Sequence, residues 1–170
     1  MSRPIVICCS QRFKAELEKF VASLVKKEVL VFYPDFKFHR KKIIRKPERL
    51  RPKLSNRTTS GLVLTHLKKI DKVHGLDGVC LIFNPLPGEG QKKSFGYIGD
   101  NTLLEIGYAS GQGMFVLMMK PNDKDCVMAA VDNTEKKMIF TVQCPKENAL
   151  NFESVWDNWL SYWVNGGPHG

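Results

Sequence analysis

The sequence predicts a single α/β domain in which helices cover both faces of a five-stranded, mostly parallel sheet, giving three α/β/α layers. Short apolar runs typical of buried parallel strands alternate with segments whose apolar residues recur at helical spacing. The length of 170 residues is that of one domain with a full core, and 43% apolar with 25% charged residues is ordinary for a globular chain.

The first predicted strand is the apolar run at residues 5–9. A helix follows up to about residue 27, because apolar side chains recur at Phe13, Leu17, Phe20, Val21 and Leu24. Ser10 lies between the two and is a natural N-cap. Its turn also points free backbone amides above the strand end, so both simple capping and an anion site at residues 10–13 remain open.

The second predicted strand, residues 29–33, ends at Pro34, and a long loop or lid is expected over residues 35–58. The part of this loop from 37 to 57 contains ten Lys or Arg and one acidic residue, a difference that equals the whole net charge of +9. The rest of the chain is neutral. The positive charge therefore belongs to one segment.

The next helix is expected to begin at Thr59 or Ser60, with Leu64, Leu67 and Ile70 on its buried side.

Three further strands are predicted, at residues 78–83, 114–119 and 138–142. A flexible loop at 86–99 precedes an apolar helix that carries Glu105, and a short helix is possible at 126–130. A Trp-rich helix ends the chain at about 151–164. The order of these elements is typical of flavodoxin-like and Rossmann-like folds.

The loop at residues 96–101 is the centre of this organisation, because a strand precedes it and an apolar helix and another strand follow it. In such βαβ units, ligands bind at the carboxyl ends of strands against helix N-termini. Three acidic residues are candidates for chemistry there: Asp77, Asp100 and Glu105. Asp77 precedes its strand and would lie at the opposite edge unless the chain bends. Glu105 also matches a capping box with Thr102, so a purely structural role stays open.

The sequence does not support several other classes of protein, including metalloproteins, membrane proteins, dinucleotide-binding proteins and serine hydrolases. The five cysteines are odd in number and lack CxxC spacing, which indicates free thiols in a reducing, cytoplasmic setting. The four histidines are scattered, so neither a metal site nor any cofactor is expected. There is no apolar run long enough to cross a membrane, no dinucleotide or P-loop glycine pattern, and no Gly-x-Ser-x-Gly elbow.

The run from Tyr97 to Ala109 (Tyr-Ile-Gly-Asp-Asn-Thr-Leu-Leu-Glu-Ile-Gly-Tyr-Ala), followed by Gly-Met-Phe-Val at 113–116, resembles the core motif of the nucleoside 2-deoxyribosyltransferase-like superfamily, which includes 2'-deoxynucleoside 5'-phosphate N-hydrolases. The first strand with Arg12 and Phe13 is similar to that family's opening strand and turn. Leu-Asp-Gly-Val at 76–79 resembles its acid-bearing third strand.

The resemblance implies that Glu105 is the nucleophile that attacks C1' of a deoxyribose, with Asp77 assisting the leaving base or holding Glu105. Asp100 is a further catalytic candidate. The substrate's sugar or phosphate would contact the two turns and the third strand's end, at Ser10, Arg12, Phe13, Asn84, Gly99, Asn101 and Thr102.

The leading hypothesis is therefore an enzyme that cleaves or transfers the N-glycosidic bond of a nucleoside or nucleotide. A non-catalytic nucleotide-binding or sensing domain of the same fold is one alternative. A nucleic-acid-binding protein using residues 37–57 is another. Related enzymes are homo-oligomers, and the tryptophans at 156, 159 and 163 offer an apolar surface, so a homodimer is expected.

Overall fold

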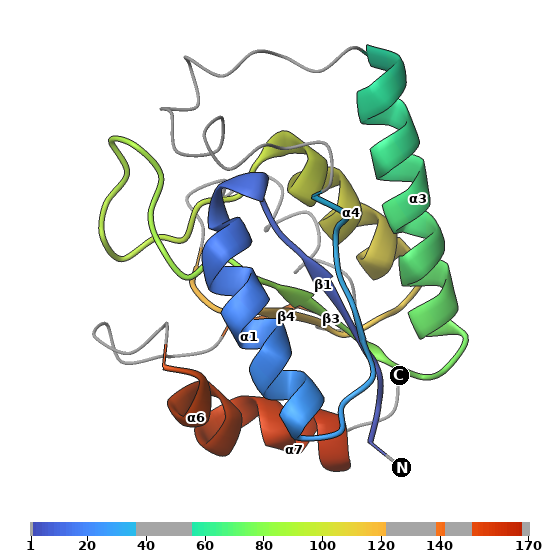
Figure 1. Ribbon diagram of the computed structural model, residues 1–170, viewed down its shortest axis with the longest axis vertical. Helices are drawn as coiled ribbons and strands as arrows, with labels where there is room; N and C mark the ends of the chain where they lie inside the picture. The colour runs from blue at the N-terminus through green and yellow to red at the C-terminus, as the bar shows by residue number, and fades with distance from the viewer. Residues whose placement is uncertain (1, 37–55, 122–138, 142–150, 168–170) are drawn as a thin grey trace.

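The computed structural model describes residues 2–36, 56–121, 139–141 and 151–167, with backbone only at 56–59 and 139–141. Strands and helices alternate along the chain (Figure 1). The strands are β1 (Ile5–Cys8), β2 (Val31–Phe32), β3 (Val79–Ile82), β4 (Val116–Met118) and β5 (Ile139–Thr141). The helices are η1 (Gln11–Phe13), α1 (Lys14–Lys26), α3 (Asn56–His74), α4 (Asp100–Gly111), α6 (Phe152–Val155), the π-helical η3 (Trp156–Leu160) and α7 (Ser161–Asn165).

Strands β2, β1, β3 and β4 form a parallel sheet flanked by helices, which confirms the predicted α/β class. The three-residue segment β5 pairs parallel with β4 and gives the order β2-β1-β3-β4-β5. This order, with β1 near the middle and β2 outside it, is that of flavodoxin-like sheets. All carboxyl ends therefore meet at one edge of the sheet.

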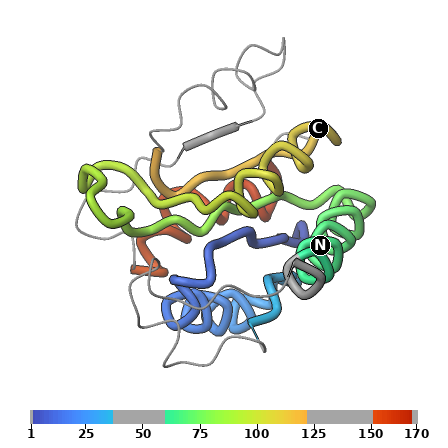
Figure 2. The backbone as a smooth tube through the Cα atoms, turned by 90° about the horizontal axis from the view of Figure 1, so that it is seen from above, coloured from blue at the N-terminus to red at the C-terminus, as the bar shows by residue number. Residues whose placement is uncertain are grey.

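Each face of the sheet packs against its own helices, because alternate residues of a strand point to opposite sides. Ile5 and Ile7 of β1 pack with α1 and with the C-terminal helices. Val6 and Cys8 point the other way and pack with α3 and α4. Figure 2 shows the strands running between α1 on one side and α4 on the other. Three layers result.

The buried side predicted for α3 is correct for Ile70, partly correct for Leu67 and wrong for Leu64, which is 59% exposed. The helix begins at Asn56, before the expected Thr59 or Ser60. Its buried face also includes His66 and Val73, which the sequence analysis did not place there. His66, Ile70 and Val73 lie four and three residues apart, on one side of a helix. A histidine thus lies on the side of α3 that faces the protein core.

Some predicted elements have other end residues in the structure, and others lie outside the residues that it describes. β2 is shorter than predicted, and the loop at 86–99 is present between β3 and α4. The expected helix at 126–130 and residues 37–55 of the expected lid lie outside the described residues.

The C-terminal aromatic side chains pack on this molecule's own core. Trp163 is 5% exposed, and its ring centroid lies 5.2 Å from that of Phe115. Trp156 and Trp159 are partly buried against the α1 face of the sheet. These tryptophans therefore pack at least in part on the sheet of the same chain. Within the described ranges, no helix combines the length and apolar character that a membrane crossing requires.

Candidate functional site

Two turns meet at the carboxyl edge of the sheet. β1 ends at Cys8 and leads through Ser10 into η1, and α4 begins after its N-cap, Gly99. A Cβ built on Gly99 would lie 4.0 Å from Ser10 Oγ, so the two turns are close neighbours. Both present helix N-termini at the edge where doubly wound folds bind ligands. The two turns named in the sequence analysis therefore lie side by side at this edge.

Glu105 lies beyond the first turn of α4 and does not cap it. The helix starts at Asp100, and Gly99 as N-cap receives no side-chain hydrogen bond. The Glu105 side chain is 7% exposed and lies beside the end of β1. The capping-box alternative is therefore wrong, because the helix begins two residues before Thr102 and Glu105 is already inside it.

Two further buried side chains meet Glu105. His66 Nε2 of α3 is 4.0 Å from Glu105 Oε1 and 3.6 Å from Cys8 Sγ of β1. The ligand-type atoms of the three side chains all lie within 4.8 Å of one another. Cys80 Sγ of β3 lies 3.6 Å from Cys8 Sγ. We call Cys8, His66 and Glu105 the buried triad.

Burial keeps the members of the triad uncharged. It raises the pKa of Glu105 to about 8, against a smaller opposing effect of the Cys8 hydrogen bond. It lowers the pKa of His66 to about 4, aided by the positive charge of Lys69. The pKa of the Cys8 thiol is raised well above its usual value, mainly by burial. At neutral pH the contact between His66 and Glu105 is therefore one between neutral groups, not an ion pair.

The triad also has unused hydrogen-bonding capacity. Glu105 Oε2 is buried and has no hydrogen-bond partner within the described part of the chain. Buried polar atoms are normally paired, so such atoms point to a bound group or to chemistry.

The other acidic candidates lie elsewhere. Asp77 sits at the amino end of β3 in a left-handed conformation (φ 53°) and forms an ion pair with Arg3 at 3.1 Å. The chain does not bend enough to bring it to the opposite edge, so the structure does not join Asp77 to Glu105. Asp100 and Asn101 are exposed in the first turn of α4, and Thr102 is buried.

Arg12 is the one cation among the predicted ligand contacts, and aromatic rings hold it in place. Its guanidinium carbon lies 4.5 Å from the centre of the Tyr97 ring and 5.6 Å from that of Phe13. Its backbone amide donates to Ser10 Oγ at 3.4 Å. Phe13 itself is 2% exposed and packs edge-on against Phe83, so its side chain belongs to the core.

Asn84 has a structural role in this conformation. Its Nδ2 donates to the Lys120 carbonyl at 2.8 Å, and its Oδ1 accepts from the Lys120 amide at 3.1 Å. It thus ties the end of β3 to the end of β4 at the carboxyl edge. Asn84 was predicted to contact the substrate, and to do so its amide group would have to bind the substrate and the Lys120 backbone at the same time.

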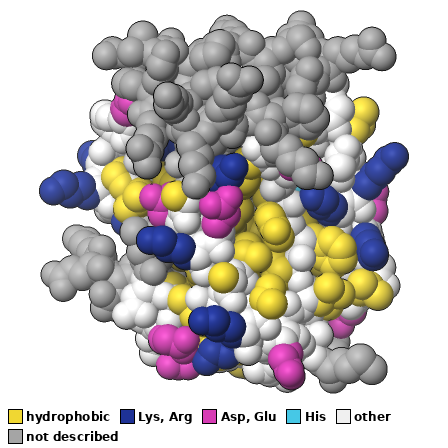
Figure 3. Space-filling view, in the orientation of Figure 1, with side chains coloured by type: hydrophobic (Ala, Val, Ile, Leu, Met, Phe, Trp, Pro, Cys, Tyr) yellow, Lys and Arg dark blue, Asp and Glu magenta, His cyan; other side chains and the backbone are white. Residues whose placement is uncertain are grey.

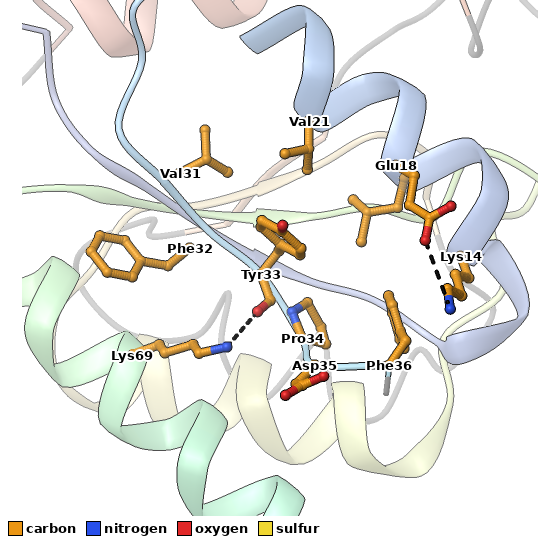
Figure 4. A pocket seen from close by; sticks show the side chains of 11 residues that line it. Lys14, Glu18, Val21, Val31, Phe32, Tyr33, Pro34, Asp35, Phe36 and Lys69 are labelled. Carbon is orange, nitrogen blue, oxygen red and sulfur yellow. Dashed lines mark hydrogen bonds and ion pairs between the residues drawn. The ribbon is translucent and has the colours of Figure 1, made fainter. Parts of the chain in front are cut away.

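A separate pocket of about 500 Å³ lies between α1 and β2 (Figure 4). Lys69 donates to the Tyr33 carbonyl at 2.6 Å across one side, and Lys14 pairs with Glu18 at 3.7 Å on the other. Apolar side chains gather on the face that β2 crosses (Figure 3). None of the predicted site residues lines this pocket. Its lining ends at Phe36, the last residue described before the gap.

Sequence reasoning missed Cys8 and His66. Cys8 was treated only as a strand residue, and His66 was dismissed because no ligand stands near it in the sequence. The useful signal was the spacing of His66 to Ile70 and Val73, which marks a histidine on the buried face of a helix.

Comparison of the chain with protein-family models, curated proteins and solved structures found no match.

Proposed function

We propose that this protein cleaves or transfers the N-glycosidic bond of a nucleoside or nucleoside 5'-monophosphate, with Glu105 as the attacking carboxyl group. The observation that carries the proposal is the position of Glu105. It is a buried carboxyl group beside Cys8, the last residue of β1, and it does not cap its own helix. The motif around Glu105 supports the same chemistry by resemblance.

The reaction needs Glu105 as a carboxylate. Its oxygen would form a bond to C1' while the bond from C1' to the base nitrogen breaks and its electron pair leaves with the base. The positive charge that develops at C1' favours the ionised carboxylate over the neutral acid. The attacking form is the ionised fraction of Glu105, whose proton is lost to solvent, because His66, with a pKa of about 4, is too weak a base to hold the proton of a group whose pKa is about 8. Water or an acceptor base then attacks C1' and releases Glu105.

The surrounding turns fit a phosphorylated substrate. The first-turn amides of α4 and the turn at Ser10 can bind anionic oxygens. Arg12, fixed over Tyr97, supplies a positive charge beside the Ser10 turn. Asp100 opposes a phosphate at the same helix end, so we assign the phosphate to the Arg12 side of the site. Asp77 has no part in this mechanism.

The free, buried thiols of Cys8, Cys9 and Cys80 support a reducing compartment, and we place the enzyme in the cytoplasm. A non-catalytic nucleotide-binding domain of the same fold remains the alternative. The hypothesis of nucleic-acid binding rests on residues 37–57, whose side chains lie outside the described part.

The test is incubation with a panel of nucleosides, deoxynucleosides and their 5'-monophosphates, with release of free base measured by chromatography. We expect release from the wild type and a loss on the order of a thousandfold or more in Glu105→Gln, because the covalent route disappears. Glu89→Gln, an exposed acid on the 86–99 loop, is the matched control and should keep full activity. Nucleotide binding without base release from any substrate would favour the non-catalytic alternative. Equal activity of both variants would exclude Glu105 as the nucleophile.

A further inference from the structure

The buried triad has the composition of a transition-metal site. A thiol, an imidazole and a carboxyl group are the three side chains that Zn²⁺ uses most. They come from three different elements, β1, α3 and α4, and all three are buried. No local spacing in the sequence brings them together. The fold alone creates the group.

The distances fit one ion bound between them. With Zn–S near 2.3 Å and Zn–N near 2.05 Å at tetrahedral angles, the sulfur and nitrogen would be about 3.6 Å apart. Cys8 Sγ and His66 Nε2 are 3.6 Å apart. The same geometry puts nitrogen and carboxylate oxygen about 3.4 Å apart, against 4.0 Å between His66 Nε2 and Glu105 Oε1. Ion binding would therefore have to bring Glu105 Oε1 closer to His66 Nε2 by about 0.6 Å.

The orientation favours a ligand set over a catalytic relay. In a Cys-His-acid relay, the thiol and the carboxylate would face different nitrogens of the imidazole ring. Here both Cys8 Sγ and Glu105 Oε1 approach the same atom, His66 Nε2. Because both neighbours approach the same nitrogen, the arrangement suits a shared ion better than a relay through the ring.

Charge balance supports the same conclusion. A Cys8 thiolate, a Glu105 carboxylate and a neutral His66 carry two negative charges, which one divalent cation cancels. Binding would release two protons and leave no net charge in a buried site, where an uncompensated charge is costly. Glu105 Oε2 has no described hydrogen-bond partner, and a bound cation would give this carboxyl group a charged neighbour.

We propose that Cys8 Sγ, His66 Nε2 and Glu105 Oε1 bind Zn²⁺ or a divalent ion of similar chemistry, with a fourth position left for water or another ligand. Cys80 Sγ, 3.6 Å from Cys8 Sγ, is a neighbour of one proposed ligand and is not counted among the three. The proposal stands independently of the proposed reaction. If both hold, metal and substrate compete for Glu105, and Zn²⁺ inhibits base release.

The test measures binding of the metal alone to the full chain, first stripped with a chelator. Isothermal titration with Zn²⁺ should give one site per chain. Co²⁺ should give the visible bands of tetrahedral coordination together with a thiolate charge-transfer band in the near ultraviolet. Loss of an outer-shell partner of a metal ligand typically costs 10–100-fold in affinity. We therefore expect about 100-fold or more from Cys8→Ser, His66→Gln or Glu105→Gln.

Cys9→Ser is the matched control. Cys9 is the adjacent cysteine, but it packs on the opposite face of the sheet and should leave Zn²⁺ affinity unchanged. Thermal denaturation of each variant checks that it folds, and Zn²⁺ should raise the Tm of the wild type and of Cys9→Ser only.

If Cys8→Ser does not fold, His66→Gln and the Co²⁺ spectrum of the wild type decide the question. Absence of a stoichiometric Zn²⁺ site, a Co²⁺ spectrum without a thiolate band, or equal affinity in the three ligand variants and the control would overturn the proposal. Each of these outcomes can occur whether or not base release is observed.

Discussion

At the scale of single residues, two glycines near the site differ in the space that their surroundings leave for a side chain. A Cβ on Gly96 would collide with the Asn84 side chain and with the Asn84 carbonyl oxygen, which belongs to the backbone and cannot rotate away. A Cβ on Gly107, in the exposed middle of α4, would meet nothing within 4 Å. The same substitution should therefore have opposite effects at the two positions.

We predict that Gly96→Ala lowers the free energy of unfolding by about 1–3 kcal/mol, as expected for overpacking. It should also disturb the bonds between Asn84 and the Lys120 backbone. Gly107→Ala should raise the free energy of unfolding by about 0.5–1 kcal/mol, because alanine is the better helix former. Urea denaturation measures both. An unchanged Gly96→Ala variant would show that the close approach at Asn84 is not tight.

The same scale explains how far the site was predictable. Glu105 was found because a recognisable motif surrounds it in the sequence. His66 and Cys8 were not found, because 58 residues separate them and their contact depends on how α3 is rotated against β1. The sequence shows that Cys8 and Cys9 point to opposite faces of the sheet, because successive residues of a strand alternate. It does not show which of the two faces packs against α3 and α4.

At the scale of secondary-structure elements, α3 and α4 are joined outside the triad by an exposed polar contact. Tyr108 Oη donates to Asp71 Oδ1 at 2.8 Å, and Gln112 Nε2 donates to the same oxygen at 2.7 Å. These bonds, Gln112 first, hold the pKa of Asp71 below its usual value of 3.8. Both helices contribute residues to the triad, so this contact helps to fix their relative position.

We predict that Tyr108→Phe lowers stability at neutral pH, and that the loss shrinks in acid. A carboxyl group whose folded-state pKa is depressed stabilises the protein above its unfolded-state pKa, and this contribution disappears as pH falls through the folded-state value. The difference in Tm between wild type and variant should thus be full above about pH 4 and decrease below it. Asp71→Asn should show the same dependence. A difference that persists unchanged into strong acid would mean that the Asp71 charge is not involved.

At the scale of the whole molecule, the C-terminal helices complete the layer that α1 begins. Trp163 is buried against Phe115, while its neighbour Tyr162 is 61% exposed. Because these tryptophans are used by the protein's own core, they leave less apolar surface for a second subunit than the sequence suggested. The homodimer stays a prediction, without support from this surface.

We predict that Trp163→Ala lowers the free energy of unfolding by about 3–5 kcal/mol, the usual range for removing a buried aromatic ring. Tyr162→Ala, at the next position on the exposed side, should change it by less than about 0.5 kcal/mol. Chemical denaturation of the two variants gives the comparison. Equal effects would show that the last helical turns do not form part of the cooperative core.

The sequence by itself determined the α/β class, the approximate limits of most described strands, and the loop and helix that carry Glu105, because these depend on local apolar periodicity and on short-range turn chemistry. It could not determine which distant side chains share the interior with Glu105. That depends on the order of strands and on the rotation of each helix about its axis, and both are set by packing the whole core at once. The place of Asp77 before its strand already indicated the opposite edge of the sheet, whereas only the tertiary structure brought Cys8 and His66 to Glu105.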